Sequence, residues 1–162
     1  MDTAKSPNRW LVFSTFTIAL LLTVYPLPLE IAWLRPQFIP LVFIYWAMTF
    51  PHVMGIGAAW LLGFLTDLIT HSILGQHALA MVVVAYICAL GYQRIRTYEP
   101  WQQALWVFVI VGIYQLFVNW VHNLTGHSAV PSDFLLPAFA SALLWPVAYT
   151  LLERLRLYYR HR

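Results

Sequence analysis

The chain has 162 residues and a formal net charge of +3; 61% of the residues are hydrophobic and 9% are charged. Soluble domains carry about 25% charged residues, and the six acids and nine bases present here are too few to cover a soluble globule of this size. The composition therefore excludes a soluble enzyme and a disordered chain, and it indicates that a lipid bilayer is the solvent for most of the protein.

The first predicted helix covers residues 10–28. Lys5 and Arg9 precede it, and no charged residue occurs between Trp10 and Leu29. A basic start followed by an apolar run is also typical of a secretory signal, but no small-x-small cleavage site follows here. We therefore predict a helix that is retained in the protein.

The next stretch, from Pro36 to Gln93, contains Asp67 as its single formally charged residue and is too long for one membrane span. Proline and glycine interrupt it at residues 50–52 and 71–77, where turns are expected. Three short helices are predicted there, over residues 36–50, 54–71 and 77–92.

A charged loop with Arg94, Arg96 and Glu99 follows, and Pro100 closes it. The run of apolar residues then resumes and is interrupted once more by a segment rich in turn-forming residues. The last two helices are predicted over residues 101–123 and 134–153, with the turn-rich segment 124–133 between them.

The placement of lysine and arginine predicts the orientation of these helices, because cytoplasmic loops are enriched in both residues. Six helices put both ends of the chain on one side. With both ends in the cytoplasm, Arg35 is the one basic residue outside, whereas five helices would strand basic residues on the outer side. The sequence thus predicts an all-α polytopic membrane protein, one integral membrane domain over residues 1–162, with six short transmembrane helices and cytoplasmic termini. The bases placed inside are Lys5, Arg9, Arg94, Arg96, Arg154, Arg156, Arg160 and Arg162.

Asp67 is the acid predicted to lie inside a helix, where a charge at the bilayer centre costs roughly 2.5–3.5 kcal/mol. Gly55, Ala59 and Gly63 precede it at intervals of four residues, so all four share one helix face. Small residues on such a face let another helix approach closely. We predict that Asp67 binds a partner helix or forms an internal polar lock; the alternative is an acid solvated near the outer end of its helix.

Two amides on the fifth helix, Gln115 and Asn119, are candidates for the partner of Asp67. They are four residues apart, and Asn119 is expected at about the depth of Asp67. An amide can donate a hydrogen bond to a carboxylate. The alternative is that these amides face a neighbouring protein or the membrane interface.

Other chemistry is poorly supported by the sequence. His71 lies four residues after Asp67, which is a possible metal-ligand spacing, but no His-Glu-x-x-His motif accompanies it. Serine-hydrolase and phosphate-loop motifs are absent, the next outer carboxylate, Asp133, lies in a loop, and the single cysteine, Cys88, rules out a disulfide framework. We expect no enzymatic activity, no metal and no cofactor, and no nucleic acid as a partner.

Three further features are candidates for structural or partner roles. Arg35 is followed by Pro36, which fixes the start of a helix, and Arg35 is expected to pair with Glu30, a lipid phosphate or a partner outside the membrane. The dipeptide Trp145-Pro146 predicts a kink in the sixth helix. The tail is expected to lie on the anionic inner leaflet, with a simple stop-transfer anchor or a docking site as alternatives. Its interface residues are Arg154, Arg156, Tyr158, Tyr159 and Arg160.

One pair of segments is distinctive: Gly63-Phe64-Leu65-Thr66-Asp67-Leu68 is followed by Leu74-Gly75-Gln76-His77-Ala78-Leu79. Further segments are Arg35-Pro36, Phe38 to Pro51 with Tyr45-Trp46-Ala47, Trp101-Gln102-Gln103-Ala104-Leu105 and Leu144-Trp145-Pro146. Together they resemble the bacterial rod shape-determining protein MreD family. The resemblance covers nearly the whole chain, and the first pair of segments is its most specific part.

The resemblance implies a non-enzymatic component of the cell-elongation machinery in the bacterial inner membrane. The implied partners are MreC, the actin-like MreB filament system, and the glycosyltransferase and transpeptidase pair that builds the lateral wall. It also implies a helix arrangement similar to the substrate-binding components of vitamin transporters. A small-molecule transporter or binding subunit is the rival interpretation, with Asp67, Gln115, Asn119 and His122 lining a pocket.

Overall fold

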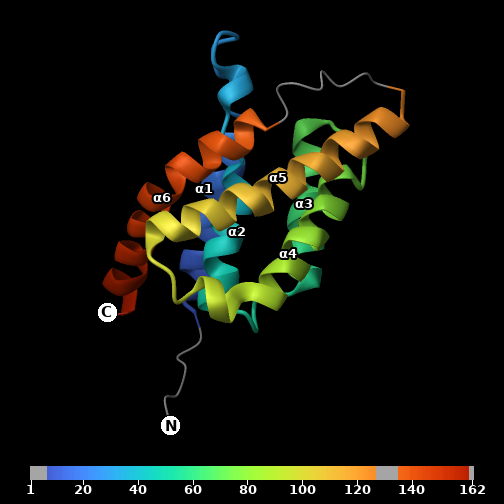
Figure 1. Ribbon diagram of the computed structural model, residues 1–162. Coiled ribbons are helices and arrows are strands. Elements are labelled where there is room, and N and C mark those ends of the chain that lie inside the picture. The colour runs from blue at the N-terminus through green and yellow to red at the C-terminus, as the bar shows by residue number, and fades with distance from the viewer. Residues whose placement is uncertain (1–6, 127–134, 161–162) are drawn as a thin grey trace.

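The computed structural model describes residues 7–126 and 135–160, and within them it contains six α-helices, one short 3-10 helix and no strand. Figure 1 shows these helices packed as one bundle. The all-α prediction is therefore confirmed for the described residues. The elements are α1 (Arg9–Val24), η1 (Ala32–Leu34), α2 (Phe38–Thr49), α3 (Ile56–Thr70), α4 (Gln76–Ile95), α5 (Pro100–Leu124) and α6 (Leu136–Arg160).

The shortest α-helix, α2, lies at the centre of the bundle and contacts α1, α4, α5 and α6. In Figure 1 it occupies the middle of the molecule, with α5 crossing it. Nine of its twelve residues are buried. A helix that is apolar on every side is one that other helices surround. At 1.5 Å per residue, α2 is about 18 Å long, which is shorter than the roughly 30 Å hydrocarbon core of a bilayer.

Three helices, α4, α5 and α6, are long and apolar enough to cross a membrane, with 20, 25 and 25 residues respectively. Two more, α1 and α3, are apolar but shorter, with 16 and 15 residues. Large apolar side chains such as Trp10, Phe13 and Leu61 are more than half exposed on these shorter helices. A surface of this kind suits lipid and not water, so the chain is a helical membrane protein.

The predicted end of the sixth helix at residue 153 is wrong, because α6 continues to Arg160. The prediction ends the helix where charged residues begin. Arginine and leucine are both strong helix formers, however, and Glu153 forms an ion pair with Arg156 one turn later. The described part of the tail is thus the last two turns of α6, not a separate segment.

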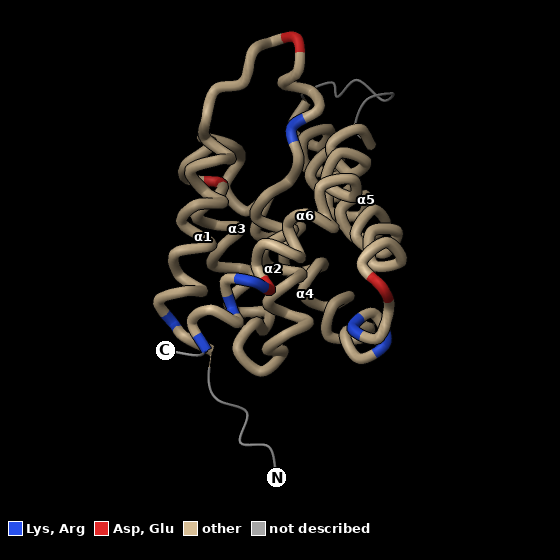
Figure 2. The backbone as a smooth tube through the Cα atoms, turned by 90° about the vertical axis from the view of Figure 1, so that its left-hand side faces the viewer, with Lys and Arg blue, Asp and Glu red and all other residues tan. Residues whose placement is uncertain are grey.

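Basic residues gather at one end of the bundle. Figure 2 shows most of the lysine and arginine segments at the end where the N- and C-terminal labels lie. This end is formed by the start of α1, the end of α4 and the end of α6. Lys5, Arg162 and most of the predicted loop 124–133, including Asp133, lie outside the described residues.

Candidate functional site

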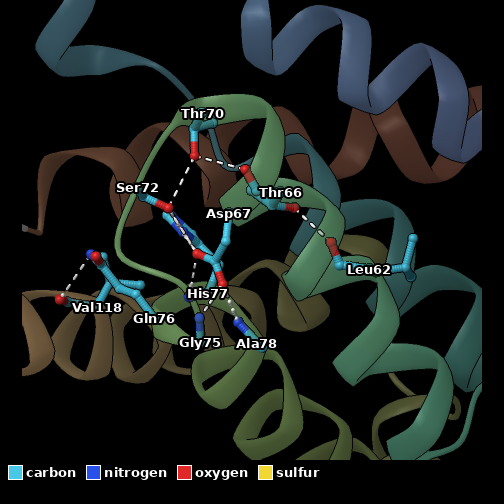
Figure 3. A network of polar contacts seen from close by, with 10 residues as sticks. All are labelled: Leu62, Thr66, Asp67, Thr70, Ser72, Gly75, Gln76, His77, Ala78 and Val118. Carbon is cyan, nitrogen blue, oxygen red and sulfur yellow. Dashed lines mark hydrogen bonds and ion pairs between the residues drawn. The ribbon is translucent and has the colours of Figure 1, made fainter.

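The most concentrated polar site of the described structure lies where α3 turns into α4, around Asp67 (Figure 3). The Asp67 side chain is buried, with 1% of its surface exposed. Five hydrogen bonds reach its two carboxylate oxygens. Oδ1 accepts from Ser72 Oγ at 2.8 Å, His77 N at 3.0 Å and His77 Nδ1 at 2.7 Å, and Oδ2 accepts from Gly75 N at 2.9 Å and Ala78 N at 3.3 Å.

Asp67 caps a helix other than its own. Three of its donors are the backbone N–H groups of Gly75, His77 and Ala78, which begin α4. The first N–H groups of a helix have no partner within the helix, and a negative charge there also interacts favourably with the helix dipole. Since Gly75, the N-cap residue of α4, has no side chain to cap it, Asp67 supplies the acceptor from α3.

Gly63 lies one turn before Asp67 on α3 and faces the first turn of α4, which Asp67 caps. A Cβ atom at Gly63 would lie 2.5 Å from both Ala78 Cα and His77 O, so only glycine fits. Ala59 is fully buried one turn earlier, whereas Gly55 is exposed, and a Cβ atom added there would have nothing within 4 Å. The small-residue face therefore brings α3 against α4 in the C-terminal half of α3 and not at Gly55.

The turn between the helices depends on two residues with positive φ. His71 ends α3 in the left-handed region, at φ 52° and ψ 32°, and Gly75 begins α4 at φ 94°. Glycine adopts such a conformation without strain. Between them, Ser72 donates its backbone N–H to Asp67 O at 3.1 Å and its hydroxyl to the carboxylate, so the turn is tied to α3 twice.

The predicted amide partners of Asp67 are wrong. Within the described residues, the hydrogen bonds to the carboxylate come from the α3–α4 turn and not from Gln115 or Asn119 on α5. Matching by depth fails because the chain returns at once and fills the position beside Asp67 with its own backbone. The contact with α5 is made instead by Gln76, whose Nε2 donates to Val118 O at 3.2 Å.

Asp67, His77 and Ser72 do not form a catalytic triad. In a triad the acid and the nucleophile contact different ring nitrogens, but here Asp67 and Ser72 both approach Nδ1 of His77, at 2.7 and 3.2 Å. The serine hydroxyl donates to the acid instead of the imidazole. In residues 7–126 and 135–160, no group of three His, Cys, Asp or Glu side chains could hold a metal, and His71 does not join the Asp67 site.

Arg35 joins the end of α1 to the start of α2. Its Nη1 donates to Thr23 O at 2.5 Å and its Nη2 donates to Tyr25 O. A cation at these carbonyls suits the negative end of the α1 dipole. Arg35 and Glu30 form no ion pair in the described structure. Pro36 follows in the connection, one residue before the α2 N-cap Gln37.

Two buried polar contacts of α6 are absent from the sequence predictions. Trp145, predicted only as part of a kink, is fully buried, and its Nε1 donates to Gln103 Oε1 at 3.2 Å. Gln103 in turn donates to Ile95 O and Tyr98 O, so it holds the α4–α5 connection against α6. Near the end of α6, Tyr45 of α2 donates its hydroxyl to Glu153 at 2.6 Å. A glutamine or tyrosine inside an otherwise apolar run was the available signal.

The predicted interface residues of the tail lie on different faces of α6. Arg154, Tyr158, Tyr159 and Arg160 are exposed, but Arg156 turns inward to pair with Glu153. Pro146 lies inside the helix, and the Thr150 hydroxyl donates to its carbonyl at 2.7 Å.

The fold and this site define a small helical membrane protein whose buried polar groups bind its own helices together. The particular family follows from two comparisons: the model of the family "rod shape-determining protein MreD" matches residues 4–155, and the rod shape-determining protein MreD of Haemophilus influenzae is 36% identical over 145 residues, which cover 90% of each chain. The chain belongs to the MreD family, as the sequence segments indicated, and has a role in cell shape. No solved structure matches the chain.

Proposed function

We propose that this protein is a non-enzymatic component of the bacterial inner membrane that maintains rod shape by assembling or regulating the complex that synthesises lateral-wall peptidoglycan. Its membership of the MreD family carries this proposal. The proposed partners are MreC, the MreB filament system, and the lateral-wall glycosyltransferase and transpeptidase pair.

The use of Asp67 supports a structural role over a chemical one. A proton carrier or a ligand-binding acid needs at least one oxygen that water or substrate can reach. Both oxygens of Asp67 are occupied by groups of the α3–α4 turn, and the side chain is buried. Asp67 is therefore not available to bind a ligand in the pocket that the transporter interpretation requires.

We propose further that all six helices cross the membrane, with both termini in the cytoplasm. The basic residues at the ends of α4 and α6 and at the start of α1 support this orientation. The short length of α2, 12 residues, is compatible with this arrangement. Because α2 contacts α1, α4, α5 and α6, other helices and not lipid cover most of its surface. Arg35 is then a base on the outer side.

The test is recovery of the proposed complex. A tagged copy is expressed in a strain that lacks the native gene, cell shape is recorded, and the protein is purified from mild detergent. We expect rod-shaped cells and co-purification of MreC, with tagged protein carrying Gly57→Ala, a change on the exposed face of α3, as a matched control that behaves like the wild type. Normal rods in the absence of the protein, or a retained small molecule without MreC, would contradict the proposal and favour a transporter.

A further inference from the structure

A shallow, open groove lies on the exposed face of α6, and all of its lining residues belong to this one helix. It has a volume of about 450 Å³ and is lined by Pro146, Val147, Thr150, Leu151 and Arg154. Val147 and Leu151 are 63% and 59% exposed, so the groove lies on the surface of the bundle. The Thr150 hydroxyl, which lines the groove, donates to Pro146 O at 2.7 Å, so its hydrogen is already used within α6.

The groove is apolar along its length and cationic at one end. Among the described residues Arg154 forms no ion pair, because the neighbouring acid, Glu153, points in a different direction from α6 and is bound to Arg156 and Tyr45. Consecutive residues of a helix point about 100° apart, which is how α6 separates its acid from Arg154. The charge of Arg154 is thus left without compensation at the mouth of an apolar surface.

The length of the groove matches the headgroup-proximal half of a membrane lipid, since one leaflet is roughly 20 Å deep. Arg154 lies eight positions after Pro146, which is about 12 Å along the helix axis. With the end of α6 in the cytoplasm, Arg154 is at the level of the inner headgroups and Pro146 is within the hydrocarbon. Arginine binds phosphate well because its planar guanidinium offers several donors to the phosphate oxygens.

We propose that this groove binds one anionic phospholipid of the inner leaflet, with the phosphate on Arg154 and an acyl chain along Val147, Thr150 and Leu151 as far as Pro146. The proposal rests on the cytoplasmic position of the α6 end given under Proposed function. It makes the lipid part of the surface that α6 presents to other membrane proteins. A protein helix in the same groove would have to bring an acid to Arg154.

Lipid binding to the purified protein tests this proposal. Native mass spectrometry in detergent compares phosphatidylglycerol with phosphatidylcholine of the same acyl chains, for the wild type and for Arg154→Gln. We expect the wild type to prefer phosphatidylglycerol and Arg154→Gln to lose about fivefold in affinity for it, which is the effect of one basic residue at an anionic membrane surface. Arg96→Gln is the matched control, because Arg96 is an exposed base of the same membrane end outside the groove.

A second pair of variants tests the apolar part. Val147→Phe fills the groove and should weaken binding of both lipids, whereas Leu90→Phe, at a comparably exposed position of α4 outside the groove, should not. Equal binding by Arg154→Gln and Arg96→Gln would overturn the proposal. A second result would also overturn it: Arg154→Gln and Val147→Phe both bind lipid as the wild type does but no longer co-purify MreC. That result would assign the groove to a protein helix. Binding in detergent is independent of orientation, so a failure of the six-span arrangement would appear in residue labelling and not here.

Discussion

Gly63 and Asp67, one turn apart on α3, act on the same turn of α4. Gly63 lets the backbone of Ala78 approach α3, and Asp67 accepts hydrogen bonds from the N–H groups of that turn. Each depends on the other, because a side chain at position 63 would move α4 out of reach of the carboxylate. The two residues therefore form one structural unit.

Replacing Gly63 with alanine should destabilise the protein by about 1–3 kcal/mol, the usual cost of overpacking. The new Cβ would lie 2.5 Å from α4 backbone atoms, which cannot move aside as a flexible side chain can. Thermal unfolding in detergent measures the effect. Gly57→Ala is the control: its Cβ has nothing within 4 Å, and alanine should stabilise an exposed helix position by about 0.5–1 kcal/mol. Equal melting temperatures for the two variants would contradict the close contact at Gly63.

Asp67→Leu should be more damaging than Asp67→Asn, and neither should be silent. Asparagine keeps one acceptor oxygen but turns an NH₂ group toward backbone donors, which leaves buried N–H groups unpaired at about 1–3 kcal/mol. Leucine removes every acceptor from Ser72, His77 and the start of α4. Unfolding temperature and cell shape at matched expression are the measurements, with the exposed acid variant Glu30→Gln as control. Complete and equal loss of function in both variants without loss of stability would revive the transport interpretation.

The fold was easier to predict from sequence than the site. Apolar runs bounded by proline, glycine and charged residues locate the helices, because a helix that contacts lipid has to be one continuous apolar stretch of the chain. The same reasoning identified Gly63 and Asp67 through their four-residue spacing. It could not identify the partner of Asp67, because three of the five donors are backbone N–H groups, which carry no residue-specific signal.

The end of α6 shows a second limit of the sequence. A change from apolar to charged residues marks where a membrane ends but not where a helix ends. Arginine and leucine continue the helix equally well on either side of that boundary. Glu153 pairs with Arg156 and also accepts a hydrogen bond from Tyr45, which α2 brings to this level. Such long-range contacts are set by packing, which the sequence pattern does not encode.

Tyr45 and Glu153 should be energetically coupled. Tyr45 is fully buried, and its hydroxyl donates to Glu153 at 2.6 Å, a hydrogen bond to a charged group. Tyr45→Phe and Glu153→Gln should each lower stability, and the double variant should lose less than the sum of the two. We expect a coupling of roughly 0.5–3 kcal/mol from a double-mutant cycle measured by thermal unfolding. Additive losses would show that the bond contributes nothing to the packing of α2 against α6.

Arg35→Gln should loosen the connection between α1 and α2. The variant loses the guanidinium that binds the carbonyls of Thr23 and Tyr25, so limited proteolysis should cut residues 25–34 faster than in the wild type. Arg9→Gln, an exposed base at the other end of α1, is the control. Recovery of MreC is measured in the same preparations. Weaker recovery without faster cleavage would mean that Arg35 acts on a partner and not on its own helices.

The last prediction concerns orientation. In a Cys88→Ser background, the thiol of Arg160→Cys should resist an impermeant thiol reagent in cells whose outer membrane alone is permeable, and the thiol of Glu30→Cys should react. Arg160 ends α6, whereas Glu30 is exposed and lies in the connection that follows the C-terminal end of α1. Cys88 is buried, so serine removes the native thiol at the cost of one small interior change. Both thiols should react once the inner membrane is opened, which controls for exposure of each position. Labelling of position 160 in intact inner membranes would refute the cytoplasmic C-terminus. Labelling of both positions there would place them on the same side, which contradicts the five spans that the positive-inside rule puts between the first loop and the tail.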